Sequence, residues 1–308
     1  MKSHRLIAPT LASFIFVLFA FTTVLSGQAQ QSADAGAWKS VEDALGRKGS
    51  MQPGDVYKFS MPRSDMKVTV AGTPIKAGLA LGSWLAFKRM GDSAMVMGDL
   101  VLTESEVDPV MKKLQQDGIE ETALHNHLLN ESPRVMYMHV AGHGDPIKLA
   151  ADLKEALALT KTPPAAPAAS ASQGNLGFDT ARVDQALGRK GKNNNGIYQF
   201  SVPRSETIHD MGMEVPPSMG TATAINFQPT GSEKAAITGD FVLLGKEVNP
   251  VIKALHDHGI AVTAVHTHML TEEPRLFFMH FWANDNAVKL AEGLKAALDQ
   301  TSSAPPQQ

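Results

Sequence analysis

Apolar residues recur along the first half of the chain with two spacings, one typical of strands and one typical of helices. Short apolar runs bounded by turn residues are typical of strands, whereas apolar residues three and four positions apart mark one face of a helix. The predicted strands are residues 56–60, 79–87, 94–102, 119–127 and 134–141, and the predicted helices are residues 38–45, 109–117 and 146–159. We therefore expect an α+β domain, in which helices pack against an antiparallel or mixed β-sheet.

Two of the predicted helices begin with an acidic residue that is followed by proline. Asp108 and Asp145 suit the N-cap position, because their side chains can accept hydrogen bonds from free backbone N–H groups. Pro109 and Pro146 suit the first helical position, where no N–H donor is needed. Gly118 suits the end of the first of these helices. The sequence thus predicts helices that start at Pro109 and at Pro146.

The second half of the chain repeats the pattern of the first half. Matched runs 141 positions apart include Gly98-Asp99 with Gly239-Asp240, His125-Asn126-His127 with His266-Thr267-His268, and Met138-His139 with Met279-His280. An ordered series of such matches indicates an internal duplication. We therefore predict two tandem homologous domains, residues 37–160 and 178–300, both of the α+β class.

Three other segments differ in composition from the domains. Residues 1–29 begin with basic residues, continue with an apolar stretch and end on the small residues Gly27 and Ala29, which is typical of a signal peptide cleaved after Ala29. The apolar stretch is also long enough for an uncleaved membrane anchor. Residues 161–177 are rich in proline, alanine and serine and predict a flexible linker. Residues 301–308 predict a disordered tail.

Composition narrows the classes of function. The 308 residues carry a net charge of −3, which does not suggest a nucleic-acid partner. The chain contains no cysteine, so disulfides, thiolate metal sites and a cysteine nucleophile are excluded, and any metal must be held by nitrogen and oxygen ligands. We expect a periplasmic or secreted protein that meets a membrane only if its signal segment stays uncleaved. The oligomeric state is left open.

Three histidines of each domain occupy positions that a β-hairpin would bring together. His125 and His127 alternate along a strand and therefore share one face. If the hairpin is centred near Ser132, His139 lies opposite His125 and Tyr137 lies opposite His127. The second domain repeats the arrangement with His266, His268, His280 and Phe278. Three neutral imidazoles with one open position form a ligand set that zinc or copper accepts.

Charged residues in the predicted hairpin loops add candidate chemistry. Glu131 and Glu272 stand beside the two histidine sets, where each could ligate a metal ion or act as a general base toward metal-bound water. Arg134 and Arg275 follow in the same loops and suit the binding of an anionic group. The hypothesis is therefore a site with metal ligands, a carboxylate base and an anion-binding arginine.

The sequence leaves three interpretations of the histidines open: metal binding, a non-metal ligand with acid–base chemistry, and a structural polar cluster. The hairpin register is decisive, because a slip of one residue would turn His139 to the opposite face. Asp99 and Asp240 are candidate partners that fix an imidazole tautomer. Methionine thioethers could ligate cuprous ion, but the strand positions of these residues favour core packing. They are Met95, Met97, Met136, Met138, Met269 and Met279.

Several runs resemble a known family. They are Leu-Gly-Arg-Lys-Gly, Pro-Arg-Ser, Gly-Asp-Phe-Val-Leu-Leu, Glu-Val-Asn-Pro-Val, Val-His-Thr-His-Met-Leu and Glu-Pro-Arg-Leu-Phe-Phe-Met-His-Phe-Trp. In these runs the chain resembles the LppY/LpqO-like family of secreted bacterial proteins and lipoproteins, which carry a domain of unknown function. The resemblance covers nearly all of residues 41–159 and 183–298, implies export and implies no established activity. The lipid-accepting cysteine of the lipoprotein members is missing here.

From the sequence we thus expect an exported protein whose repeated histidines bind a divalent transition metal, zinc or copper, or a small anionic ligand. One alternative is a metal-dependent hydrolase of the cell envelope, in which Glu131 or Glu272 activates metal-bound water. Another is a non-catalytic module that binds envelope material or a partner and uses the histidines structurally. A small molecule or an envelope component is the expected ligand in either case.

Overall fold

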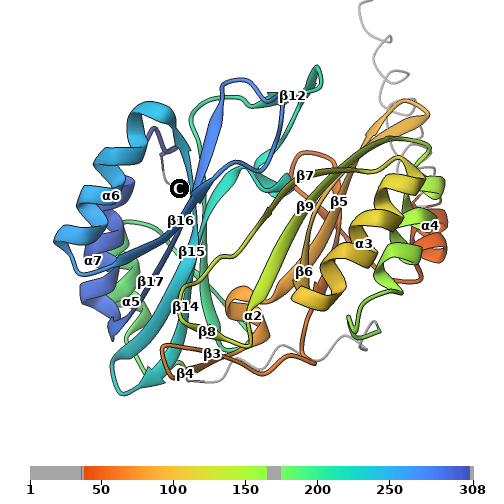
Figure 1. Cartoon of the computed structure of the whole chain (residues 1–308). Helices are drawn as coiled ribbons and strands as arrows, with labels where there is room; N and C mark the ends of the chain where they lie inside the picture. Colours follow the sequence, from red (N-terminus) through yellow and green to blue (C-terminus); the bar gives the residue numbers. More distant parts are fainter. Residues whose placement is uncertain (1–35, 37, 165–174, 306–308) are drawn as a thin grey trace, which may run out of the picture. The chain divides into compact units, whose positions relative to one another are not determined.

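The computed structural model describes residue 36 and residues 38–164 and 175–305 (Figure 1). The predicted signal segment, residues 1–29, lies outside the described residues, as do positions 165–174 of the predicted linker. Both domains belong to one compact unit, Val41–Gln308. In the part of the chain that the structure describes, no helix combines the length and the apolarity needed to cross a lipid bilayer.

The first domain is built on a six-stranded antiparallel sheet with the strand order β1-β2-β5-β6-β9-β7. Its strands are β1 (Ser50–Gln52), β2 (Val56–Pro62), β5 (Gly82–Met90), β6 (Ser93–Thr103), β9 (Val135–Gly144) and β7 (Glu120–His125). A small sheet holds β4 (Thr73–Ile75), β3 (Val68–Val70) and β8 (Glu131–Ser132). The helices are α2 (Ala77–Ala80), α3 (Glu104–Asp117) and α4 (Pro146–Leu157).

The second domain repeats this topology, with the strand order β10-β11-β14-β15-β17-β16. Its strands are β10 (Lys192–Asn194), β11 (Ile197–Pro203), β14 (Ala222–Gly231), β15 (Lys234–Leu244), β17 (Leu276–Asn286) and β16 (Ala261–His266), with the small pair β12 (His209–Asp210) and β13 (Met213–Glu214). The helices are α5 (Thr180–Leu187), η1 (Pro217–Met219), η2 (Gly245–Glu247), α6 (Val248–Asp257) and α7 (Ala287–Leu298). The predicted fold class, two tandem α+β domains, is confirmed.

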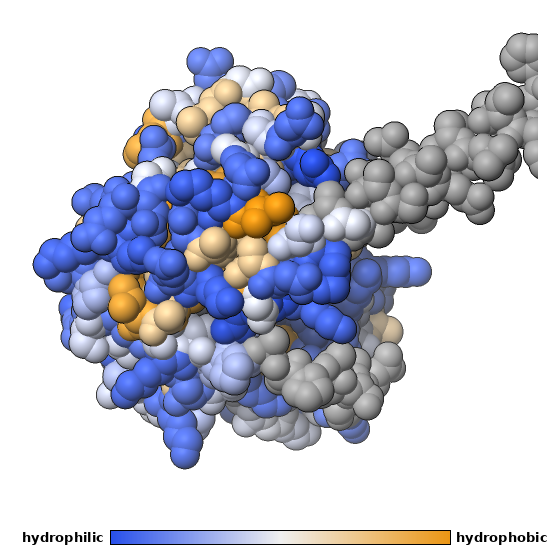
Figure 2. All heavy atoms as spheres, turned by 90° about the vertical axis from the view of Figure 1, so that its right-hand side faces the viewer, coloured by the Kyte–Doolittle hydropathy of each residue, from blue (hydrophilic) through white to orange (hydrophobic). Residues whose placement is uncertain are grey.

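Helices cover one face of each large sheet. In Figure 1, α3 and α4 lie against the first sheet, and α5, α6 and α7 lie against the second. In the second domain this layer encloses a core in which Val251 and Leu255 of α6 and Leu290 of α7 are buried together with Phe281 of the sheet. Figure 2 views the side on which α3 and α4 lie, where hydrophilic residues predominate and hydrophobic residues form small separate patches.

The opposite faces of the sheets, together with the short helices α2 and η1, supply two further cores, and each of these cores contains residues of both domains. One combines Leu79 and Tyr137 of the first domain with Ile197 and Ala236 of the second. The other is rich in methionine and combines residues of β5 and β6 with residues of β15, β17 and η1. The two domains are therefore packed against each other through buried apolar side chains. Burial of apolar surface is the dominant favourable contribution to the free energy of such association.

Several of the hydrogen bonds between the domains come in matched pairs. Lys58 Nζ donates to the Ser218 carbonyl at 3.0 Å, and the equivalent Gln199 donates to the Gly78 carbonyl at 3.4 Å. A second matched pair joins Gln228 to Pro74 at 2.8 Å and Lys88 to Glu214 at 3.0 Å. Exchanging the two domains turns each bond into its counterpart. The domains are thus related by an approximate two-fold axis.

Two predicted elements differ from the observed ones. The helix expected to start at Pro109 begins five residues earlier, because Thr103 and Glu106 form a capping box that serves the first turn. The apolar run of residues 79–87 contains the end of α2 and the start of β5 instead of one strand. An apolar run alone does not separate helix from strand. The predicted start of α4 at Pro146, with Asp145 as its N-cap, is confirmed.

A buried ion pair in each domain holds the segment that follows the last helix. Arg63 bonds to Glu106 at 2.8 Å, and Glu106 also accepts from the Lys161 backbone N–H at 2.8 Å. In the second domain Glu247 accepts in the same way from the Ser302 backbone N–H. Ser303 pairs with Arg204 as an antiparallel bridge. The first part of the segment expected as a disordered tail is therefore fixed to the second domain.

Candidate metal centre

The hairpin register differs from the predicted register by two residues. His139 pairs with Ala123, and Tyr137 pairs with His125, after a bulge between Glu121 and Ala123. The expectation that His125 lies opposite His139 is therefore wrong. Because the shift is an even number of residues, the side chains keep the expected face. The same holds in the second domain, where Ala264 pairs with His280.

The six histidines form one cluster to which both domains contribute. The ring centroids of His125 and His266, which are equivalent residues, lie 3.6 Å apart. The other two contacts exchange under the approximate two-fold axis: His127 lies 3.8 Å from His280, and His139 lies 3.6 Å from His268. The sequence predicts a separate trio in each domain. It does not predict that the trios meet, because nothing in the sequence indicates which faces of the two sheets pack together.

Two overlapping groups have the spacing needed to hold a metal ion. One contains His125, His266, His268 and His280, and the other contains His125, His127 and His139. Within each group the ligand atoms lie within 4.8 Å of one another. The four-residue group takes three ligands from the second domain and one from the first. His125 belongs to both groups, which makes it the central residue of the cluster.

Several imidazole nitrogens in the cluster are buried without a hydrogen-bond partner. They are Nε2 of His125, His127, His139 and His280, and Nδ1 of His266. Buried polar atoms are nearly always hydrogen-bonded, so five such atoms in one place require an explanation. His280 Nδ1 donates to the Gly239 carbonyl at 2.8 Å, which leaves the lone pair of its Nε2 free. That nitrogen is in the form that binds a metal ion.

The backbone at Gly239 is part of this arrangement. A Cβ atom at this position would clash with the Ala224 carbonyl on the neighbouring strand, and Gly98 in the first domain is similarly crowded by Trp84. Glycine therefore allows the adjacent strands to approach closely where they support His280 and His139. This requirement explains why glycine occurs at this position in both domains.

Burial keeps the imidazoles uncharged. It is the main cause of a lowered pKa in all six, and it brings the pKa of His125 to about 4 and that of His280 to about 3. Repulsion from neighbouring imidazoles lowers the pKa of His127 and His139 further. Neutral imidazoles present free lone pairs at pH 7, and metal ions bind that form.

Asp99 and Asp240 lie beside the cluster without a direct hydrogen bond to it. Asp240 Oδ2 is 3.6 Å from His268 Nε2, and Asp99 Oδ1 is 3.9 Å from His139 Nε2. The predicted role of these carboxylates in fixing a tautomer is not seen, since the Gly239 carbonyl does so for His280. Burial raises the pKa of Asp99 to about 8 and that of Asp240 well above its ordinary value. A nearby cation would favour their charged forms.

Glu131 and Glu272 mainly support their loops. Glu131 Oε1 accepts from the Val135 N–H at 3.0 Å, and Glu272 Oε1 accepts from the Leu276 N–H at 2.9 Å. Neither residue belongs to a group with metal-ligand spacing among the described residues. The second oxygen of Glu131 is buried without a partner, and burial raises the pKa of Glu131 to about 7. A base or ligand role for these carboxylates therefore stays a prediction.

The predicted anion-binding arginines are placed differently in the two domains. Arg134 is exposed and lies 3.8 Å from Glu104. Arg275 bonds to Glu272 at 3.1 Å and to the Leu270 carbonyl at 3.1 Å, so it stabilises its own loop. The structure shows no contact between either guanidinium and the described histidines. Anion binding by these residues is a prediction that the geometry does not strengthen.

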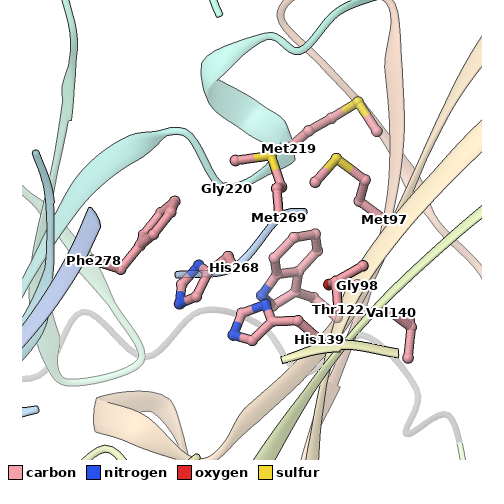
Figure 3. Close-up of a pocket in the computed structure, with 11 residues that line it drawn as sticks. Met97, Gly98, Thr122, His139, Val140, Met219, Gly220, His268, Met269 and Phe278 are labelled. Carbon is pink, nitrogen blue, oxygen red and sulfur yellow. The ribbon is translucent and has the colours of Figure 1, made fainter. Parts of the chain in front are cut away.

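A pocket adjoins the cluster at the His139–His268 contact (Figure 3). Figure 3 shows the two imidazoles on one side and three methionine side chains on the other. The lining residues are Trp84, Met97, Gly98, Thr122, His139, Val140, Met219, Gly220, His268, Met269 and Phe278. Sequence analysis missed Met219, because it lies in a short 3₁₀ helix where strand periodicity gives no signal.

Comparison with known proteins gives a family but no activity. The sequence matches the family described as Domain of Unknown Function (DUF1259) over residues 39–159 and 181–300. No curated protein matches the sequence.

Two solved structures are similar at low identity. A trimeric bacterial microcompartment shell protein, PduB, is 13% identical, with 83% of this chain and 95% of that chain covered and a TM-score of 0.21. EtuB from Clostridium kluyveri is 8% identical, with 81% and 90% covered and a TM-score of 0.19. Superposition at this level carries no information about function.

Proposed function

The chain belongs to the family described as Domain of Unknown Function (DUF1259), and we propose that it binds one divalent transition metal ion, zinc or copper, between its two domains. The ligands are His125, His266, His268 and His280. Nitrogen ligands of this kind suit both zinc and copper. His125 is shared with the second group, so occupation of the first group removes a ligand from the other. One divalent ion per chain follows.

The unpaired buried nitrogens carry this proposal. In a purely structural polar cluster, imidazoles would bond to one another or to the backbone, because an unsatisfied buried polar atom is costly. Here only the His266–His268 contact, with Nε2 atoms 2.8 Å apart, joins two rings by a hydrogen bond. An ion held by the four ligands would give the unpaired Nε2 atoms of His125 and His280 a partner. The carboxylate of Asp240, 3.6 Å from His268 Nε2 and 3.8 Å from His280 Nδ1, would balance part of the positive charge.

The geometry favours binding over hydrolysis. A metal-dependent hydrolase would use Glu131 or Glu272 to activate metal-bound water. Both carboxylates already accept from backbone N–H groups in their loops, and neither has ligand spacing to the histidines. We therefore propose a metal-binding protein without assigning a reaction to it.

The compartment is part of the proposal. The basic, then apolar, then small-residue pattern of residues 1–29 supports export, and so does the resemblance to the LppY/LpqO-like secreted proteins. We place metal binding in the periplasm or outside the cell. An all-nitrogen site suits these compartments, because its ligands are not cysteine thiolates, which oxidise there.

Elemental analysis of the tag-free chain, purified without chelators, tests the proposal. We expect one zinc or copper ion per chain, and loss of that ion in a His266→Ala variant. His256→Ala is the matched control, because His256 is an exposed histidine of α6 and should leave the metal content unchanged. Metal-free wild-type protein after incubation with zinc or copper would contradict the proposal. Retention of the ion by His266→Ala would contradict it as well.

A further inference from the structure

The pocket beside the histidine cluster breaks the symmetry between the domains. It is lined by Met97, Met219 and Met269. The equivalent positions on the other side of the two-fold axis hold Thr238, Leu79 and Leu128. All three of these counterparts are buried, so non-methionine side chains fill the same space elsewhere in the molecule. Packing alone therefore does not require three methionines here.

The three methionines come from separate segments and meet at one place. Met97 lies on β6, Met219 ends the 3₁₀ helix η1, and Met269 follows β16. All three are at most 6% exposed. Figure 3 shows their side chains gathered on one side of the pocket, opposite the imidazoles of His139 and His268. Methionines from three segments and two imidazoles thus line one small pocket.

One of these imidazoles offers an unused ligand atom. His139 is 5% exposed, and its Nε2 has no hydrogen-bond partner. It belongs only to the smaller of the two histidine groups, so the proposed divalent site does not consume it. His139 lines the pocket, and its unpartnered Nε2 is an observation independent of the methionines that points to a ligand.

The chemistry of this ligand set selects a soft cation of low charge. Thioether ligands favour Cu(I), and imidazole accepts copper in the same site. Methionine sulfur carries no charge, so a monovalent ion is easier to bury in such a pocket than a divalent one. Asp99, near His139, can balance a single positive charge. Zinc and other harder divalent ions would prefer the imidazoles of the main cluster.

We propose that Met97, Met219 and Met269, together with His139, form a binding site for monovalent copper. The site adjoins the divalent centre proposed above and does not depend on its occupation. It places two metal sites of different chemistry at the same domain junction, one of nitrogen ligands and one mainly of thioethers. No electron transfer is part of the proposal.

Anaerobic competition with a chromophoric Cu(I) chelator tests this site in the full chain. We expect the variant with Met97→Leu, Met219→Leu and Met269→Leu to bind Cu(I) about 100-fold or more weakly, at least the effect that losing supporting groups has at other metal sites. Leucine preserves side-chain volume, so the fold should tolerate the changes. The matched control replaces Met95, Met213 and Met279, which are buried but do not line the pocket, with leucine and should leave the affinity unchanged.

Two further readouts keep the outcomes separate. X-ray absorption of the Cu(I)-loaded wild-type protein should show sulfur neighbours, and this measurement does not depend on any variant folding. Zinc content should be the same in the methionine variant and in the wild type. Cu(I) bound with nitrogen neighbours only, or equal Cu(I) affinity in the methionine variant, would overturn this inference. If the wild-type protein binds Cu(I) but no zinc, the divalent proposal is overturned and this inference is not.

Discussion

The two domains have the same strands in the same order, yet the two sides of their shared histidine cluster differ. On one side, His127 stacks on Tyr137 with ring centroids 3.2 Å apart, next to Leu128. On the other, His268 stacks on Phe278 at 3.6 Å, next to Met269. Duplication therefore explains the scaffold and the imidazoles. The residues around the imidazoles determine what each side can bind.

The buried ion pairs offer the strongest test of the equivalence of the two domains. Arg63–Glu106 and Arg204–Glu247 have the same 2.8 Å separation and are almost fully buried. Replacing Glu106 or Glu247 with alanine leaves the buried guanidinium with Asp65 or Glu206 as its remaining carboxylate partner, so we expect a cost of about 3 kcal/mol, the lower end of the range for breaking a buried ion pair. We expect the Glu106→Ala and Glu247→Ala variants to lose similar free energies of unfolding, measured by urea denaturation. A loss in only one of the two variants would show that the two scaffolds are not equivalent.

Metal affinity should separate the domains more sharply. His280 belongs to the four-ligand group, whereas His139 belongs only to the three-ligand group. His280→Ala should therefore weaken zinc binding by about 100-fold, while His139→Ala should weaken it by about 10-fold or less, within the range that supporting groups contribute. Isothermal titration with zinc measures both values. Equal losses of zinc affinity in the two variants, or a larger loss in His139→Ala, would contradict the assignment of the ligands.

Exchanging the aromatic residues at the cluster sharpens the comparison further. Tyr137 donates to the Ala80 carbonyl at 3.0 Å, so Tyr137→Phe should cost about 1 kcal/mol in the free energy of unfolding. Phe278 is fully buried, and Phe278→Tyr adds a hydroxyl group there. The residue equivalent to Ala80 in the second domain is Gly220, whose carbonyl is the expected acceptor. If this hydroxyl finds the equivalent carbonyl, Phe278→Tyr should be nearly neutral by thermal denaturation. A cost above about 2 kcal/mol would indicate an unsatisfied hydroxyl and a real difference in backbone position.

The smallest effects should come from exposed ion pairs on the equivalent helices. Lys112–Asp108 on α3 and Lys253–Asp257 on α6 are both exposed on the surface. Replacing either lysine with alanine should change stability by less than about 0.5 kcal/mol, because solvent screens such pairs. Urea denaturation with a matched wild-type control measures this. A larger change on one helix only would mean that its surface contributes to a contact that the other lacks.

The sequence predicts the architecture well because the evidence for it is local or repeated. Ordered matches 141 positions apart reveal the duplication, and Asp145 with Pro146 marks the start of α4. The capping box at Thr103 competes with the Asp108–Pro109 signal, and the sequence alone gives no basis for choosing between them. The hairpin register was missed by two residues because the hairpin is centred on Glu131, one residue before the expected centre at Ser132, as the pairing of His125 with Tyr137 shows.

The candidate site could be predicted only in part. The predicted hairpin brings His125, His127 and His139 together, and their imidazoles are observed with metal-ligand spacing, although β7 ends at His125 and His127 lies just beyond it. The meeting of the two sets depends on which faces of the sheets pack together, and this is a long-range property. Met219 joins the pocket from a segment with no periodic pattern. Glu131 and Glu272 are near the histidines in sequence, but their side chains bond to the loop backbone.

A crystal structure of the zinc-loaded chain, with anomalous scattering measured on both sides of the zinc edge, tests the central claim most directly. We predict a single anomalous peak between the domains, within coordination distance of His125, His266, His268 and His280. Separate peaks in the two domains, each held only by the histidines of that domain, would contradict a shared centre. Zinc bound only at surface residues away from the cluster would contradict it equally.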